Sequence, residues 1–243
     1  MPELNKANRQ VCDVDIRILK TMAPFLFFDT ANTTTAGLTS DNVYAMAKGA
    51  RKITFQNPLN GTMTIEAQVF PFEVYALFSD GIVETSAIYA EHKTIKASQA
   101  GKLSIENAKA PVFVYKVGEY GRMPIEGNFA GGLFTATSTE DIAVDSEYEV
   151  GYFVVKETGI KRVPINNKKL PKDYYITQKT LDKNEDGELF PFVMTAYKAT
   201  IQRNLDLSFS SEGDPMSITL TFDIQEDADG NVVDMIELTD EAE

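Results

Sequence analysis

Alternation of apolar and polar residues is most regular between Arg203 and Ile224, where two runs flank a turn at residues 210–215. Successive side chains of a strand point to opposite faces, so each run predicts a strand with one apolar and one polar face. The short turn between them predicts an antiparallel hairpin. Its apolar face supplies the residues predicted to pack in the sheet core: Leu205, Leu207, Phe209, Met216, Ile218, Leu220, Phe222 and Ile224.

The polar face of this hairpin carries small hydroxyls, amides and carboxylates, at Asn204, Asp206, Ser208, Ser217, Thr219, Thr221 and Asp223. Each arm is about nine residues long, or roughly 30 Å. A two-stranded ribbon of that length cannot bury its own apolar face or satisfy its outer backbone edges. The hairpin therefore requires further strands, from the same chain or from a neighbouring subunit.

Strand-like patterning recurs along the rest of the chain and predicts a mainly β protein. A buried strand is expected within Met22–Phe28, and an Asp-Gly turn at residues 229–230 predicts a last strand over Val232–Leu238. The other predicted strands are Ile53–Phe55, Met63–Val69, Ser86–Ile95, Leu103–Ile105, Val112–Val117, Tyr148–Val155, Tyr174–Thr177 and Phe192–Ile201. One segment, Phe72–Phe78, follows Pro71 and precedes Gly81, which favours a short α-helix.

Two stretches rich in turn-forming residues, Thr30–Asn42 and Glu157–Gly187, are predicted to be long loops. The sequence as a whole predicts one β domain over residues 1–243, an antiparallel sandwich or barrel-like fold with an acidic end at residues 239–243. The second loop is basic, and its candidates for contact between subunits are Lys161, Arg162, Lys168, Lys169 and Lys172. The alternative is a solvated basic loop with no partner.

Charge is distributed unevenly along the 243 residues. The formal net charge is −13, and no Lys or Arg follows Arg203. A surface of that sign repels phosphates, which argues against tight nucleic-acid binding yet allows DNA to slide past. The alternative is an acidic end that serves only solubility. A lone cysteine, Cys12, excludes an internal disulfide and is typical of a protein made in a reducing cytoplasm. The apolar run at residues 22–28 is too short to span a bilayer.

Residues suited to catalysis or metal binding are scarce. His92 is the only histidine and lies in a strand-like run without a nucleophile motif. The segment Asp182–Gly187 matches the first half of a calcium loop, but its twelfth position is Val193 in place of a bidentate Glu. Acidic pairs such as Glu147 and Glu149 arise freely in a chain with 36 acids. The sequence therefore predicts no catalytic, cofactor or metal site.

The order of these parts resembles that of bacteriophage tail tube proteins, also called major tail proteins, of long-tailed phages. The resemblance extends from Lys48 to Leu238. It rests on Lys48–Phe55, on the strand that ends in Pro71–Phe78, on the β-rich segments around Gly151, and on the Glu212–Pro215 turn with its long strand and the Asp229-Gly230-Asn231 hairpin.

The resemblance implies a structural subunit that assembles into stacked hexameric rings around a channel for DNA ejection. Its partners would be other copies of itself, with sheath, tape-measure, baseplate or terminator proteins as further candidates. It would act in the virion tail after synthesis in the host cytoplasm, with no membrane and no specific DNA binding. The lumen candidates are then Asn204, Asp206, Ser217, Thr219, Thr221 and Asp223, while the two long loops would contact the next ring or another neighbour of the ring. The opposite assignment, with this hairpin on the outer sheet, stays open.

Two other classes remain as alternatives. A monomeric β-sandwich binding module, such as a baseplate, decoration or carbohydrate-recognition domain, needs a concave ligand site, for which the sequence offers no candidate. A hydrolase that uses acidic pairs is the least supported, because His and Cys are scarce.

Overall fold

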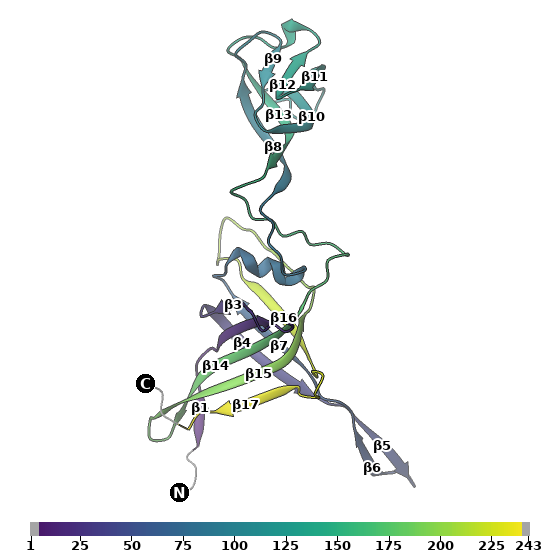
Figure 1. The fold of residues 1–243 in the computed structure, drawn as a ribbon, viewed down its shortest axis with the longest axis vertical. Helices are drawn as coiled ribbons and strands as arrows, with labels where there is room; N and C mark the ends of the chain where they lie inside the picture. The colour runs from purple at the N-terminus through teal and green to yellow at the C-terminus, as the bar shows by residue number, and fades with distance from the viewer. Residues whose placement is uncertain (1–4, 240–243) are drawn as a thin grey trace. The chain divides into compact units, whose positions relative to one another are not determined.

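The computed structural model describes residues 5–239 and confirms a mainly β protein built from antiparallel sheets (Figure 1). Contacts cluster in two compact units. Unit 1 contains the described residues up to Ile82 and those from Val163 onward, and unit 2 is Val83–Arg162. The sequence-based expectation of a single domain over residues 1–243 stays a prediction.

Unit 1 is built on one sheet, in which nine strands lie within the described residues. The strand order is β3-β2-β14-β15-β16-β7-β4, with β1 on β14 and β17 on β15. The strands are β1 (Lys6–Asn8), β2 (Asp13–Ile18), β3 (Pro24–Phe28), β4 (Ala31–Thr39), β7 (Asn60–Ala67), β14 (Asp173–Asn184), β15 (Leu189–Ile201), β16 (Ile218–Gln225) and β17 (Val233–Glu237). A separate hairpin consists of β5 (Asn42–Ala47) and β6 (Ala50–Gln56).

The sheet of unit 1 curls, because its two edge strands, β3 and β4, are joined by only Asp29 and Thr30. The N–H of Cys12 donates to Thr34 Oγ1 at 3.2 Å and so ties the segment before β2 to β4. Apolar side chains fill the curl and form one core, with fully buried members such as Ile65 and Phe222. The barrel-like architecture expected from the sequence is therefore present, but the sheet does not close.

The expected short helix spans Phe72–Phe78 and lies across one end of the curled sheet (Figure 1). It is a 3-10 helix and not an α-helix, with Val74 N donating to the Pro71 carbonyl at 3.1 Å. The tighter winding suits so short a segment. Its almost wholly apolar surface is explained by its place in the core, where Val74, Leu77 and Phe78 are buried.

Unit 2 has its own core between two small sheets, ordered β10-β13-β8 and β11-β12-β9. Alternate residues of β13, among them Val150 and Tyr152, point into this core. The strands are β8 (Ala87–Lys96), β9 (Lys102–Ser104), β10 (Ala108–Lys116), β11 (Gly127–Ala130), β12 (Leu133–Ala136) and β13 (Glu147–Lys156), and a 3-10 turn occupies Thr139–Asp141.

Both predicted long loops are partly strand. Thr30–Asn42 contains the nine-residue strand β4, and Glu157–Gly187 contains the twelve-residue strand β14. The loop prediction is wrong for β4 because Thr, although common in loops, also favours a pleated, half-buried strand surface. β14 forms ladders with both β2 and β15, so the sheet decides its conformation more than its own polar residues do.

The hairpin predicted for Arg203–Ile224 is only half correct. Its second arm is β16, but the first arm of the hairpin is Leu189–Ile201, and residues 202–217 form a loop. Ile218, Leu220, Phe222 and Ile224 are buried, whereas Met216 and Leu205 are half-buried. Leu207 is 40% exposed and Phe209 81% exposed, because their segment has no partner strand. Most of the acidic end, residues 240–243, lies outside the described residues.

Candidate assembly surface

The β5–β6 hairpin projects from the sheet of unit 1 (Figure 1), and its apolar side chains on one face are exposed. Register pairs share a face, and here Val43 lies opposite Phe55 and Ala45 opposite Ile53. Val43, Ile53 and Phe55 are 54%, 57% and 56% exposed. An isolated two-stranded hairpin is marginal in water, and clustered exposed apolar residues mark contact sites. This face is therefore a candidate contact surface for another molecule.

The opposite face of the same hairpin carries an aromatic and a charged side chain. The Arg51 guanidinium carbon lies 4.0 Å from the centroid of the Tyr44 ring, a cation–π contact that helps to hold the two strands together. The tip residues Lys48 and Gly49 both have positive φ, as a tight two-residue turn requires. The hairpin is therefore a formed structural element, even though neither core covers it.

The edge strand β4 is a second open surface of unit 1. β4 pairs with β7 on one side. Its sequence, ANTTTAGLT, carries no charge and no proline. Sheet edges in soluble proteins are usually protected by such residues, since bare backbone groups pair readily with another chain. Beyond the single Cys12 contact at Thr34, this edge is suited to pairing with another subunit.

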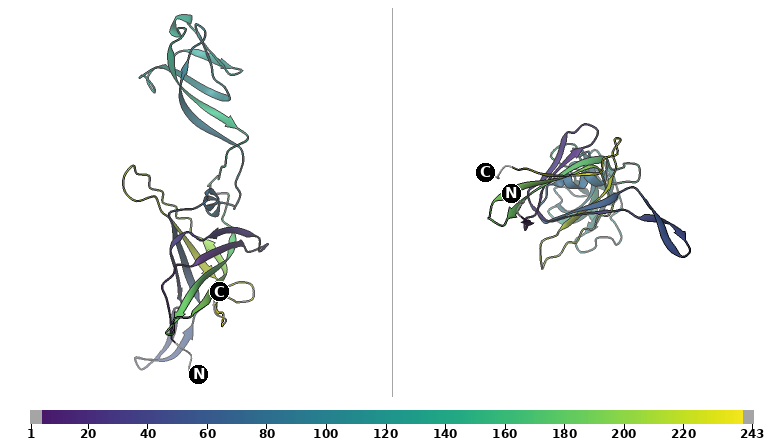
Figure 2. Two further views of the ribbon diagram at one scale, coloured as in Figure 1. Left: turned by 90° about the vertical axis from the view of Figure 1, so that its left-hand side faces the viewer. Right: turned by 90° about the horizontal axis from the view of Figure 1, so that it is seen from below.

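Five of the six lumen candidates line one cavity of about 960 Å³, beneath the loop of residues 202–217. Ser217, Thr219 and Thr221 come from the β16 side, and Asn204 and Asp206 from the loop. The sixth, Asp223, accepts a 2.7 Å hydrogen bond from Gln202 Nε2. Figure 2 shows the loop, in yellow-green, standing away from the strands. The structure therefore brings these polar residues together on one side of β16.

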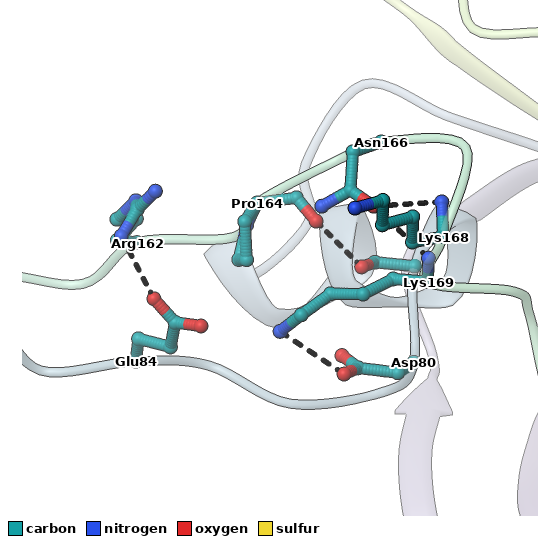
Figure 3. A network of polar contacts seen from close by, with 8 residues as sticks. Asp80, Glu84, Arg162, Pro164, Asn166, Lys168 and Lys169 are labelled. Atoms are coloured by element: carbon teal, nitrogen blue, oxygen red, sulfur yellow. Dashed lines mark hydrogen bonds and ion pairs between the residues drawn. The ribbon is translucent and has the colours of Figure 1, made fainter.

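The five basic residues predicted to contact other subunits differ in their partners and exposure, and Figure 3 shows three of them, Arg162, Lys168 and Lys169. In unit 2, Arg162 Nη1 contacts Glu84 Oε2 at 3.0 Å, beside a backbone bridge between the same residues. In unit 1, Lys169 Nζ contacts Asp80 Oδ2 at 3.0 Å. Lys161 and Lys168 are exposed, and Lys172 is half-buried. Arg162 and Lys169 therefore pair with acids of their own chain.

Asp80 has the most clearly perturbed carboxyl of this region. Burial alone would raise its pKa, but the hydrogen bond and the positive charge of Lys169, with backbone N–H groups, bring the pKa of Asp80 below its ordinary value. Nearby, Ser79 Oγ donates to the Pro164 carbonyl at 2.7 Å, and Asn166 Oδ1 accepts from the backbone N–H groups of Lys168 and Lys169 (Figure 3). These bonds fix the segment 164–169 against the end of the 3-10 helix.

The lone histidine, His92, and the lone cysteine, Cys12, belong to different units. The His92 ring stacks on Tyr120 at 4.0 Å between centroids, and Cys12 is a half-buried free thiol. Among residues 5–239, no group of three or more His, Cys, Asp or Glu side chains could hold a metal ion. None of the helices in the described part of the chain is long and apolar enough to cross a membrane.

Sequence reasoning missed the apolar face of the β5–β6 hairpin. Only Ile53–Phe55 was predicted as a strand. The signal was present, since Val43 and Ala45 alternate with Tyr44 and lie across a Lys-Gly turn from Ile53 and Phe55. The Thr-rich residues before Asn42 obscured it.

Comparison with known proteins identifies a family that matches this chain. The model of the YomU/Tube protein family matches residues 9–237. No curated protein matches the chain. Proteins of this family are structural components of the phage tail that associate with copies of themselves into a tube. The chain therefore belongs to the YomU/Tube family of phage tail tube proteins.

Proposed function

We propose that copies of this protein form closed rings, which stack into the tube through which DNA leaves the virion. The observation that carries the proposal is the uncovered apolar face of Val43, Ile53 and Phe55 on a chain of this family. A neighbouring copy provides a partner that is always available where tubes are built. We expect six copies in each ring.

In this proposal the polar side of β16 faces the channel. Thr219 is exposed and Thr221 half-buried, and both point away from the core that holds Leu220 and Phe222. Hydroxyls and carboxylates offer phosphates no cation to bind, so DNA passes without specific contacts. The bare edge of β4 extends the sheet from one subunit to the next.

Charge contributes a weaker, longer-range contact. Lys168 and Lys161 are exposed in the basic segment, while the chain beyond Arg203 contains no basic residue. These opposite charges on two ends of neighbouring subunits would attract each other and set their relative orientation. Sheath, tape-measure, baseplate or terminator proteins are the further partners that a tube of this kind requires.

Size-exclusion chromatography and negative-stain imaging of the purified chain test this function. Rings or tubes are expected as the concentration rises, or when preformed tube ends are added as a template. A protein that stays monomeric under both conditions would contradict the proposal and favour a monomeric binding module.

A further inference from the structure

The ladder between β15 and β16 stops abruptly. Its register runs from Lys198 opposite Gln225 to Ile201 opposite Phe222. One more bond follows, from Gln202 N to the Thr221 carbonyl at 2.7 Å. Beyond it, within the described residues, no ladder pair joins residues 203–217 to β16.

Continuing the same register by counting residues matches the two sides of the loop. Polar Asn204 and Asp206 would lie opposite polar Thr219 and Ser217, while Leu205 and Leu207 would lie opposite Ile218 and Met216. The continuation leaves residues 210–213 as a four-residue turn, in which Gly213 already has φ of 100°. The sequence on both sides is therefore built to pair.

The space between these two sides is the cavity of about 960 Å³, lined by Asn204 and Asp206 across from Ser217 and Thr219. In this subunit the cavity separates the two sides. If the two sides paired as strands, this space would be closed. Two apolar residues of the unpaired side are exposed, Leu207 at 40% and Phe209 at 81%, whereas Leu205 is half-buried against the core of unit 1.

Arg203 explains why pairing stops where it does. In the continued register it lies opposite Leu220, which is fully buried, so its side chain would point toward the core. A guanidinium cannot be buried there without a partner. Its Nη2 instead donates to the Asn166 carbonyl at 2.9 Å, and the chain leaves the sheet at this residue.

We propose that residues 203–209 are held open in the free subunit and pair with β16 when a second copy covers the exposed Leu207 and Phe209. This rests on the proposed function, because the second copy is the neighbour in the ring. Coverage of Leu207 and Phe209 compensates for moving Arg203, so strand formation and ring formation become one cooperative step. The subunit therefore completes its channel-facing hairpin only in the assembly.

Hydrogen–deuterium exchange tests this pairing at single amides. Gln202 bonds across to Thr221, and hydrogen-bonded positions alternate along an antiparallel pair. The amides of Asn204, Asp206, Ser217 and Thr219 should therefore exchange freely in the subunit and at least about tenfold more slowly in tubes. Tubes in which these amides exchange as in the subunit would overturn the inference and leave the proposed function intact. Absence of any ring or tube would instead contradict the proposed function.

A disulfide gives an independent readout. In a Cys12→Ser background, Asn204→Cys with Thr219→Cys should cross-link in assembled tubes and remain reduced in the subunit, because only paired strands bring the two Cα atoms to about 5.5 Å. The matched control pair, Asn204→Cys with Ser217→Cys, is out of register and should cross-link in neither. Equal cross-linking of both pairs would contradict the register.

The variant Arg203→Leu tests what holds the loop open. It removes the charge that opposes pairing, so protection of the same four amides should appear already in the free subunit. An unchanged exchange pattern in the variant subunit would contradict the role assigned to Arg203.

Discussion

Tyr120 lies directly over Gly151, so closely that a Cβ built on Gly151 would be 2.4 Å from the Tyr120 hydroxyl oxygen. Gly151 is on β13 opposite His92 of β8, and the His92 ring stacks on the same tyrosine. A glycine in a strand leaves bare backbone, and here an aromatic ring from a loop covers it. This contact ties the loop after β10 to the outer face of the unit 2 sheet.

Replacing Gly151 should therefore displace Tyr120. We expect Gly151→Ala to reduce the free energy of unfolding by about 1 kcal/mol, the usual worth of an aromatic contact, because a tyrosine hydroxyl on a loop can move aside. Urea unfolding of the full chain, with near-ultraviolet circular dichroism, measures the change. In a double-mutant cycle Tyr120→Ala should add little to Gly151→Ala. Fully additive losses would show that the two residues do not act together.

Gly61 provides a contrasting case in unit 1. A Cβ there would lie 2.6 Å from the Gly37 carbonyl oxygen, a backbone atom that cannot swing away. Gly61→Ala should force β4 and β7 apart and cost more than Gly151→Ala, on the order of 2–3 kcal/mol. The same urea titration decides it, and a smaller loss than for Gly151→Ala would contradict the close approach of the two strands.

The apolar face of the β5–β6 hairpin should control assembly. Phe55→Asp places a charge in the contact and is expected to raise the concentration needed for ring or tube formation at least about tenfold, equivalent to ~1.4 kcal/mol. Met123→Asp is the matched control, because Met123 is 87% exposed on unit 2. Light scattering against concentration measures both variants. Equal effects of the two variants would show that the hairpin is not part of the assembly contact.

The ion pair of Asp80 with Lys169 should contribute to stability in a pH-dependent way. The folded pKa of Asp80 is lowered, so its contribution is complete above the unfolded value and is lost as the pH falls through the folded value. With side chains 27% and 28% exposed, solvent screens the pair, and we expect Asp80→Asn to cost less than ~1 kcal/mol at neutral pH. Urea unfolding should show this difference shrinking as the pH falls below the ordinary pKa of an Asp carboxyl, about 3.9. A difference that persists there would point to packing in place of charge.

Salt should weaken assembly if the basic segment meets the acidic end of a neighbour. Raising the ionic strength from about 0.1 M to about 1 M shortens the screening length from roughly 10 to 3 Å, which should loosen tubes. Lys168→Gln should make assembly less sensitive to salt. If salt affects the tubes of neither the unchanged protein nor the Lys168→Gln variant, apolar and backbone contacts alone would account for assembly.

The strands were largely predictable because alternation records which face is buried. In β16, Ile218, Leu220, Phe222 and Ile224 alternate with polar residues, and all four are buried. The same signal failed at residues 203–209, where the alternation is equally clear but the structure has a loop. Alternation reports that a segment can form a strand, and whether it does depends on a partner outside the segment.

The assembly surface was less predictable for the same reason. Val43 and Phe55 read as ordinary core residues, since a sequence does not distinguish an apolar side chain buried by its own chain from one buried by a neighbour. Thr-rich β4 was mistaken for a loop because its long-range pairing with β7 decides its conformation. The basic residues were predicted as contacts between subunits, and two of them, Arg162 and Lys169, pair with Glu84 and Asp80 of their own chain.

Cryo-electron microscopy of assembled protein tests the proposed channel lining and the hairpin contact together. We expect closed rings of copies, stacked into a tube, with Thr219 and Thr221 on the channel wall and the β5–β6 hairpin of each subunit covered by a neighbour. A map in which these threonines face away from the axis, or in which the hairpin remains uncovered, would contradict this expectation.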